Sequence, residues 1–153
     1  MVTRRNTLAL LGATPLAVSL AAQAGATTPN SYSNEGFAIN GIDPIGYFEQ
    51  EAVIEGKPEF AFDWEDATWI FSSAKNLEMF TADPVKYAPQ FGGYCAYAVS
   101  RGYTASTDPK AWSIVNEKLY LNFSRPVRLL WRRDIAGNIA LGEANWPGVL
   151  GHS

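Results

Sequence analysis

Alternation of apolar and polar residues predicts two β-hairpins in this chain. Aromatic residues take every second position over residues 60–64, and the alternation resumes over residues 69–71. A period of two with aromatic enrichment is typical of β-strands. Glu65-Asp66 separates the two runs as a two-residue turn, without the glycine that such turns favour. A second hairpin of the same kind is predicted over residues 112–123.

Helical periodicity follows each hairpin. Ser72 or Ser73 can cap a helix whose apolar residues share one face, and Asp83-Pro84 ends it because proline disfavours helical backbone in the preceding residue. Ser124 caps a second helical region, which we expect Gly137-Asn138 to interrupt. Hairpins and helices in sequential blocks predict a small single-domain α+β fold with two antiparallel hairpins and two or three short helices.

The N-terminal residues predict an export signal. Arg4 and Arg5 precede an apolar run over residues 8–20 that is too short to span a bilayer. Ala22-Gln23-Ala24 then forms a cleavage site with small residues at its ends. The paired arginines resemble a twin-arginine signal, and the general secretory route stays open as an alternative.

The organisation that follows from this signal has three parts. We expect residues 1–24 to be cleaved, residues 25–34 to form a flexible leader and residues 35–148 to form the domain. No other segment is long and apolar enough for a membrane span. The mature chain is therefore predicted to be a soluble protein of the periplasm or another exported compartment.

Charge and cysteine content narrow the function classes. Without Arg4 and Arg5, ten basic residues remain against 15 acidic ones, and this net charge of −5 argues against nucleic-acid binding. A single cysteine cannot form an intramolecular disulfide, so the five Trp, seven Tyr and eight Phe must supply the stabilising core. The one histidine, His152, lies beside the C-terminus, which argues against a Cys–His hydrolase.

Five stretches of the chain stand out by their order and spacing: Asp43-Pro44-Ile45, residues 67–73, residues 80–97, Ala111-Trp112 and Asn145-Trp146-Pro147. Together they resemble the YHS domain family and an exported bacterial branch of it. The resemblance implies a treble-clef-like core with a C-terminal helical extension, in a module often attached to copper or other heavy-metal transport proteins. The cysteines of those relatives are missing here at residues 45–46 and 72–76, so a tetrahedral cysteine site does not carry over.

Cys95 is the candidate centre of a site because it follows Gly92-Gly93. Glycine permits a sharp turn or the close approach of a ligand, so we interpret Gly92 and Gly93 as a structural turn that presents the thiol. The thiol could then bind a metal ion or react. The alternative is that Cys95 packs as a small apolar residue, as free cysteines commonly do.

Asp43, Tyr94 and Tyr97 are the other candidate site residues. Asp43 belongs to the entry motif of the resemblance and would act as an oxygen ligand or as a hydrogen-bond acceptor for Cys95. Alternatively, it forms a local turn with backbone N–H groups. Tyr94 and Tyr97 flank the thiol in sequence and could line a polar pocket, or they could be core aromatics whose hydroxyls find local partners.

Three functional hypotheses follow. The first is an exported, non-catalytic accessory protein that holds a small ligand or a metal ion, such as copper or zinc, near Cys95. The second is a thiol redox protein in which Cys95 is a single reactive cysteine. The third is a module that docks a protein partner and performs no small-molecule chemistry. The sequence favours a binding protein over an enzyme.

Overall fold

The computed structural model describes residues 27–152. The predicted export signal, residues 1–24, lies outside these residues. The described chain mixes helices with small antiparallel strand pairs, so the predicted α+β class is confirmed. No helix within residues 27–152 is both long enough and apolar enough to cross a bilayer.

Three antiparallel strand pairs are present in the described residues. They are β1 (Ser33–Asn34) with β2 (Phe37–Ala38), β3 (Lys57–Trp64) with β4 (Ala67–Phe71), and β5 (Trp112–Val115) with β6 (Lys118–Leu121). The last two are the hairpins expected from the alternation. Their turn residues all have positive φ although none is glycine, with values of 49° and 64° at Glu65 and Asp66.

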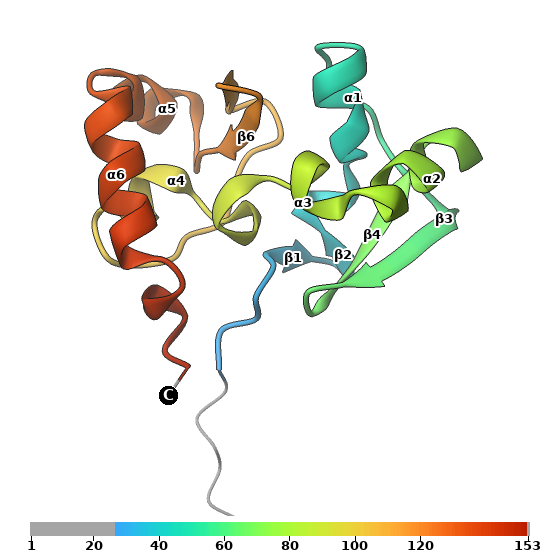
Figure 1. Ribbon diagram of the computed structural model, residues 1–153, viewed down its shortest axis with the longest axis horizontal. Coiled ribbons are helices and arrows are strands. Elements are labelled where there is room, and N and C mark those ends of the chain that lie inside the picture. The colour runs from blue at the N-terminus through green and yellow to red at the C-terminus, as the bar shows by residue number, and fades with distance from the viewer. Residues whose placement is uncertain (1–26, 153) are drawn as a thin grey trace, which may run out of the picture.

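Six α-helices and three short 3-10 helices complete the described chain. The α-helices are α1 (Pro44–Glu49), α2 (Ala74–Ala82), α3 (Pro84–Tyr87), α4 (Ala96–Ser100), α5 (Arg125–Arg132) and α6 (Ile135–Asn145). The 3-10 helices are η1 (Ile39–Gly41), η2 (Gln90–Gly93) and η3 (Gly148–Leu150). In Figure 1, β1–β4 and α1–α3 lie on one side of the molecule, and α4–α6 lie on the other.

Side-chain caps set several helix boundaries. Ser73 Oγ accepts the Asn76 N–H at 3.1 Å to begin α2, and Ser124 Oγ accepts the Val127 N–H at 3.2 Å to begin α5. These are the predicted caps, and each satisfies an N–H that has no partner within its helix.

The expected interruption at Gly137-Asn138 does not occur. The break falls earlier, at Asp134, whose carboxylate accepts the Gly137 N–H at 3.0 Å and begins α6. Asn138 is buried and its amide donates to the Trp131 carbonyl at 2.9 Å. Asn138 therefore joins α6 to the end of α5 instead of breaking the helix.

The end of the predicted leader is part of the fold. Ser31 is buried, and the Tyr32 N–H donates to the Gly92 carbonyl at 2.8 Å. Ser33–Asn34 then pairs with Phe37–Ala38. These contacts order residues 31–34, which their polar composition had assigned to the leader.

The apolar residues form two cores. The first core contains Ala38, Ile39, Ile42, Ile45, Tyr47, Trp69, Phe71, Phe80, Tyr87, Ala88, Leu119 and Leu121. The second core contains Phe91, Tyr94, Ala96, Val99, Tyr120, Trp131 and Leu150. Strand β6 contributes alternate residues to each, because successive side chains of a strand point to opposite faces. This strand therefore joins the two cores.

Candidate functional site

The thiol of Cys95 is buried, with 1% of the residue exposed. Its Sγ lies 3.5 Å from Asn122 Oδ1 and accepts the Phe123 N–H at 3.2 Å. Burial raises the pKa of the Cys95 thiol, while backbone N–H groups of Ala98, Phe123 and Tyr97 act in the opposite direction. A reactive cysteine needs an accessible thiolate and a lowered pKa, so this geometry favours a packed thiol.

The surroundings of Cys95 do not form a metal-ligand set. Within the described chain, no group of three or more His, Cys, Asp or Glu residues is placed to hold a metal ion. The polar side chain beside the sulfur is the neutral amide of Asn122. Copper and zinc prefer several thiolate or imidazole ligands, so the residues around this thiol do not fit either ion.

Gly92 and Gly93 both have positive φ, 62° and 82°, at the end of η2. A Cβ atom on Gly92 would lie 2.0 Å from the carbonyl oxygen of Asn30, and one on Gly93 would lie 2.5 Å from the side chain of Ile39. The glycines therefore allow the close approach of the chain's own N-terminal segment.

Asp43 is fully buried at the start of α1 and accepts four hydrogen bonds. Oδ1 accepts the Ile45 N–H at 2.9 Å, and Oδ2 accepts the N–H and the hydroxyl of Ser72, each at 2.8 Å. Oδ2 also accepts an amide N–H of Asn76 at 2.8 Å. Asp43 thus connects α1, the end of β4 and α2, and its carboxylate is occupied by donors of the fold itself.

The side chains of the two candidate tyrosines have their polar contacts with groups other than the sulfur. The Tyr94 hydroxyl donates to the Pro29 carbonyl at 2.8 Å, and burial raises the pKa of this phenol. Tyr97 lies under the guanidinium of Arg101, 4.9 Å from the ring centre. The Tyr97 N–H and the Cys95 thiol both meet Asn122 Oδ1, whereas Asp43 and Cys95 share no hydrogen-bond partner within residues 27–152.

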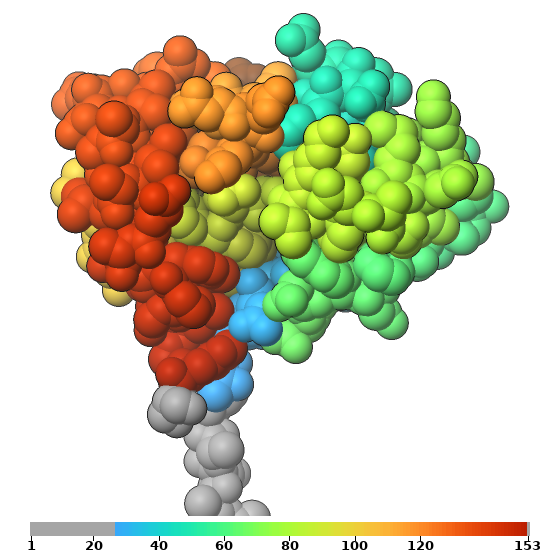
Figure 2. Space-filling view, viewed as in Figure 1, coloured from blue at the N-terminus to red at the C-terminus, as the bar shows by residue number. Residues whose placement is uncertain are grey.

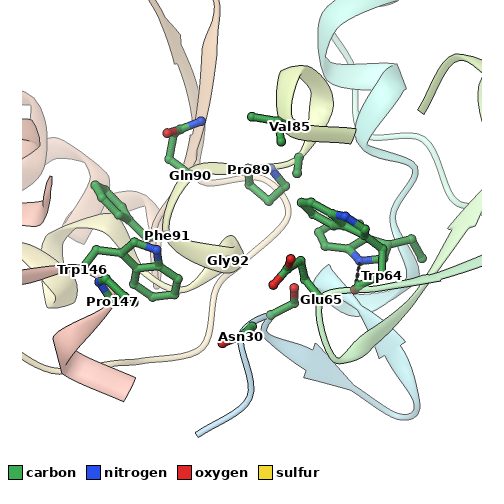
Figure 3. Close-up of a pocket in the computed structure, with 13 residues that line it drawn as sticks. Asn30, Trp64, Glu65, Val85, Pro89, Gln90, Phe91, Gly92, Trp146 and Pro147 are labelled. Atoms are coloured by element: carbon green, nitrogen blue, oxygen red, sulfur yellow. Dashed lines mark hydrogen bonds between the residues drawn. The ribbon is translucent and has the colours of Figure 1, made fainter. Parts of the chain in front are cut away.

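A cleft of about 380 Å³ lies between the two halves of the molecule. Four of its 13 lining residues are aromatic, and the full set is Asn30, Ser31, Trp64, Glu65, Trp69, Val85, Ala88, Pro89, Gln90, Phe91, Gly92, Trp146 and Pro147. In Figure 3, Trp64 and Glu65 lie on one side, Phe91, Trp146 and Pro147 lie on the other, and Gly92 lies between them. Figure 2 shows the N-terminal end of the described chain, in blue, between C-terminal residues in red and the green segment that contains β3 and β4.

Neighbouring aromatic residues fix both walls of the cleft. Trp146 packs against Phe91 with 6.0 Å between ring centres. On the other side, Trp64 packs against Trp69 at 5.9 Å, and the Trp69 indole N–H donates to the Trp64 carbonyl at 3.0 Å. These contacts place the walls before any ligand arrives, as expected of a preformed binding site.

Sequence reasoning did not find this cleft. Trp64, Phe91 and Trp146 are far apart along the chain, and each sits in a different local pattern. The available signal was the glycine pair, which implied that something approaches the backbone at Gly92. The cleft forms there because Asn30 and the Trp146 ring both approach that glycine, with Trp146 3.1 Å from where its Cβ would lie.

Comparisons with protein-family models, with curated proteins and with solved structures find no match to this chain. The resemblance to the YHS domain family stays a prediction from the sequence.

Proposed function

We propose that this chain is an exported, non-catalytic binding protein whose ligand is a small organic molecule held in the aromatic cleft. One observation carries the proposal. Aromatic residues from both halves of the fold line a cleft of about 380 Å³, whereas Cys95 is packed inside the protein. The export signal and the resemblance to YHS domains support an accessory role, and both remain part of the proposal.

The lining residues favour binding over catalysis. Glu65 is the one titratable side chain among them, and no cysteine, histidine or lysine is included. General acid–base catalysis commonly needs a second group to return or remove a proton, and nucleophilic catalysis needs an activating base. The single carboxylate of Glu65 can bind a ligand, but it has neither a second proton-transfer group nor a nucleophile beside it.

The size and chemistry of the cleft match a small organic ligand. Ligand sites are commonly concave regions of about 300–1,000 Å³ with apolar walls and a few polar groups. Here the walls are Trp64, Phe91 and Trp146, while Asn30 and Gln90 offer amide groups. Such a site would bury the carbon skeleton of a ligand and orient it by one or two hydrogen bonds.

The test is a panel of small organic fragments followed through the indole N–H signals of the five tryptophans. We expect bound fragments to shift the signals of Trp64 and Trp146, which line the cleft. Trp112 and Trp131 do not line it and serve as internal controls, with Trp131 fully buried in the second core. Single Trp→Phe variants assign the signals.

Cys95→Ser distinguishes the cleft from a ligand site at the thiol. We expect the variant to bind the same fragments with unchanged affinity, and we expect added copper or zinc to show no stoichiometric, Cys95-dependent binding. Binding that disappears with the thiol, or a panel in which no fragment shifts Trp64 or Trp146, contradicts the proposal.

A further inference from the structure

The cleft carries negative charge at one end. Glu65 lines the cleft, and a neighbouring depression around the same β3–β4 turn is lined by Asp63, Glu65 and Asp66. Neither set of lining residues contains a lysine, an arginine or a histidine. Three carboxylates around one concave region attract cations, and nearby low-dielectric walls strengthen that attraction.

Glu65 is the carboxylate that is left for a ligand. Asp63 accepts the Thr68 hydroxyl at 2.6 Å, and Asp66 accepts the Asn30 N–H at 3.0 Å. The exposed side chain of Glu65 makes no hydrogen bond or ion pair with any residue in the described part of the chain. The turn therefore presents one free negative charge at the edge of the aromatic wall.

The adjacent aromatic faces favour the same class of ligand. Trp64 precedes Glu65 and lines the same cleft. Among aromatic side chains, tryptophan attracts cations most strongly over the face of its ring. Phe91 and Trp146 offer apolar surface on the opposite wall. A ligand with a positive charge at one end and carbon groups at the other matches this distribution.

A further polar group at the cleft lacks a partner. Ser31 lines the cleft and is 1% exposed, and its Oγ has no hydrogen-bond partner among residues 27–152. An unsatisfied buried hydroxyl is unfavourable, but this Oγ has almost no accessible surface, so a ligand with a hydroxyl or an N–H group would have to shift part of the cleft wall to pair with it. Ser31 is independent of the charge argument.

We propose that the cleft binds a small organic cation, an alkyl- or aryl-substituted ammonium, with its charge beside Glu65 and Trp64 and its carbon groups against Phe91 and Trp146. This inference rests on the proposed function, because it names the class of ligand that the same cleft takes. The carboxylate of Glu65 and the absence of a basic lining residue disfavour an anionic ligand.

Two cations and one neutral isostere test the charge preference. Choline and benzyltrimethylammonium are titrated into the full mature chain in phosphate buffer, with 3,3-dimethylbutan-1-ol as the neutral isostere of choline. We expect the cations to bind about 3- to 30-fold more tightly than the neutral alcohol, the range that cation–π attraction supplies. The preference should decrease as salt is added, because Glu65 is exposed and screened.

Substitutions at two cleft-lining residues test where the cation binds. Glu65→Gln should lower cation affinity while leaving that of the neutral alcohol unchanged. Val85→Arg brings a positive charge to a lining residue that is 73% exposed, and should weaken cation binding several-fold by repulsion. Leu129→Arg makes the same charge change on α5, at a residue 64% exposed and outside the cleft lining, and should have little effect.

The outcomes separate this inference from the proposed function. If the neutral alcohol binds as tightly as both cations, or if Glu65→Gln leaves the ratio unchanged, the cation assignment is overturned while binding in the cleft stands. If neither cation binds more tightly than the alcohol and other fragments still shift Trp64 and Trp146, the ligand belongs to another class. The binding site in the cleft is itself removed if no fragment of the panel shifts Trp64 or Trp146, or if binding disappears in Cys95→Ser.

Discussion

Asp43 in the first half of the fold and Asn122 in the second are both fully buried polar side chains, but the two differ in how far they are hydrogen-bonded. In the first half, both carboxylate oxygens of Asp43 accept hydrogen bonds from three segments of the chain. In the second half, Asn122 Oδ1 accepts the Tyr97 N–H at 3.0 Å and lies 3.5 Å from the Cys95 sulfur, while Nδ2 has no partner in the described structure.

This difference indicates that Asp43 contributes more to holding the fold together than Asn122 does. A buried acceptor that satisfies four donors fixes the segments that carry them, because each donor would otherwise be left unpaired. At Asn122, by contrast, the amide oxygen has hydrogen-bond partners, but the amide nitrogen has none in the described structure. The sequence left a ligand-binding role and a local turn open for the motif residue Asp43, and in the structure its carboxylate is occupied by donors of the fold.

The largest expected effect comes from truncating these two side chains. Asp43→Ala removes the acceptor for the backbone and side-chain donors of Ile45, Ser72 and Asn76, and we expect a loss of about 3–5 kcal/mol in the free energy of unfolding. Asn122→Ala removes an amide whose own donor is already unpaired, so we expect about 1–2 kcal/mol. Urea unfolding of both variants gives the comparison. An equal loss at the two positions would show that the hydrogen-bond count does not distinguish the halves.

A smaller effect is expected where the two halves meet. Gly92→Ala places a Cβ atom 2.0 Å from the Asn30 carbonyl oxygen and keeps a positive φ, so we expect a loss of about 2–4 kcal/mol. The measurement is again urea unfolding, with near-ultraviolet circular dichroism to follow the aromatic packing around the cleft.

Gly102→Ala is the matched control for this substitution. Gly102 also has a positive φ, 91°, but nothing lies within 4 Å of where its Cβ would be. It should therefore show the backbone cost alone, about 1–2 kcal/mol. A Gly92→Ala variant no less stable than Gly102→Ala would mean that the N-terminal segment is not held against the glycine.

Local features of the chain were predictable from the sequence, because their causes are local. The alternation that defines the β3–β4 hairpin and the cap of α2 at Ser73 depend on residues a few positions apart. The turn at Glu65-Asp66 was located by the end of the alternation even though its positive φ values lack a glycine. These elements required no knowledge of the tertiary structure.

The site could not be predicted in the same way, because its contacts join distant segments. Besides the local donor Ile45, the residues that donate to Asp43 lie 29 and 33 positions later in the chain, at Ser72 and Asn76. The cleft likewise combines Trp64 and Trp146, whose separation leaves no periodic signal. At the glycine pair the approaching groups are Asn30 and Ile39 of the chain itself, whereas the Cys95 sulfur is contacted by other residues, Asn122 and Phe123.

The smallest expected effect is the pH dependence that the Cys95 thiol contributes. Because burial raises its pKa above the ordinary value of 9.0, the unfolded chain loses this proton first as the pH rises. The thiol's contribution to stability is therefore complete below about pH 9 and is lost as the pH rises toward the folded-state pKa, with a slope of at most about 1.4 kcal/mol per pH unit. Comparing unfolding free energies of the native chain and Cys95→Ser from pH 7 to 10 separates the contribution of the thiol from that of the tyrosines, which titrate in both proteins.

The native chain should lose more stability than the variant above pH 9. Its thiol should also react with iodoacetamide far more slowly before denaturation than after. Identical pH profiles, or fast alkylation of the folded protein at neutral pH, would instead place the sulfur within reach of solvent and restore the thiol as a candidate site.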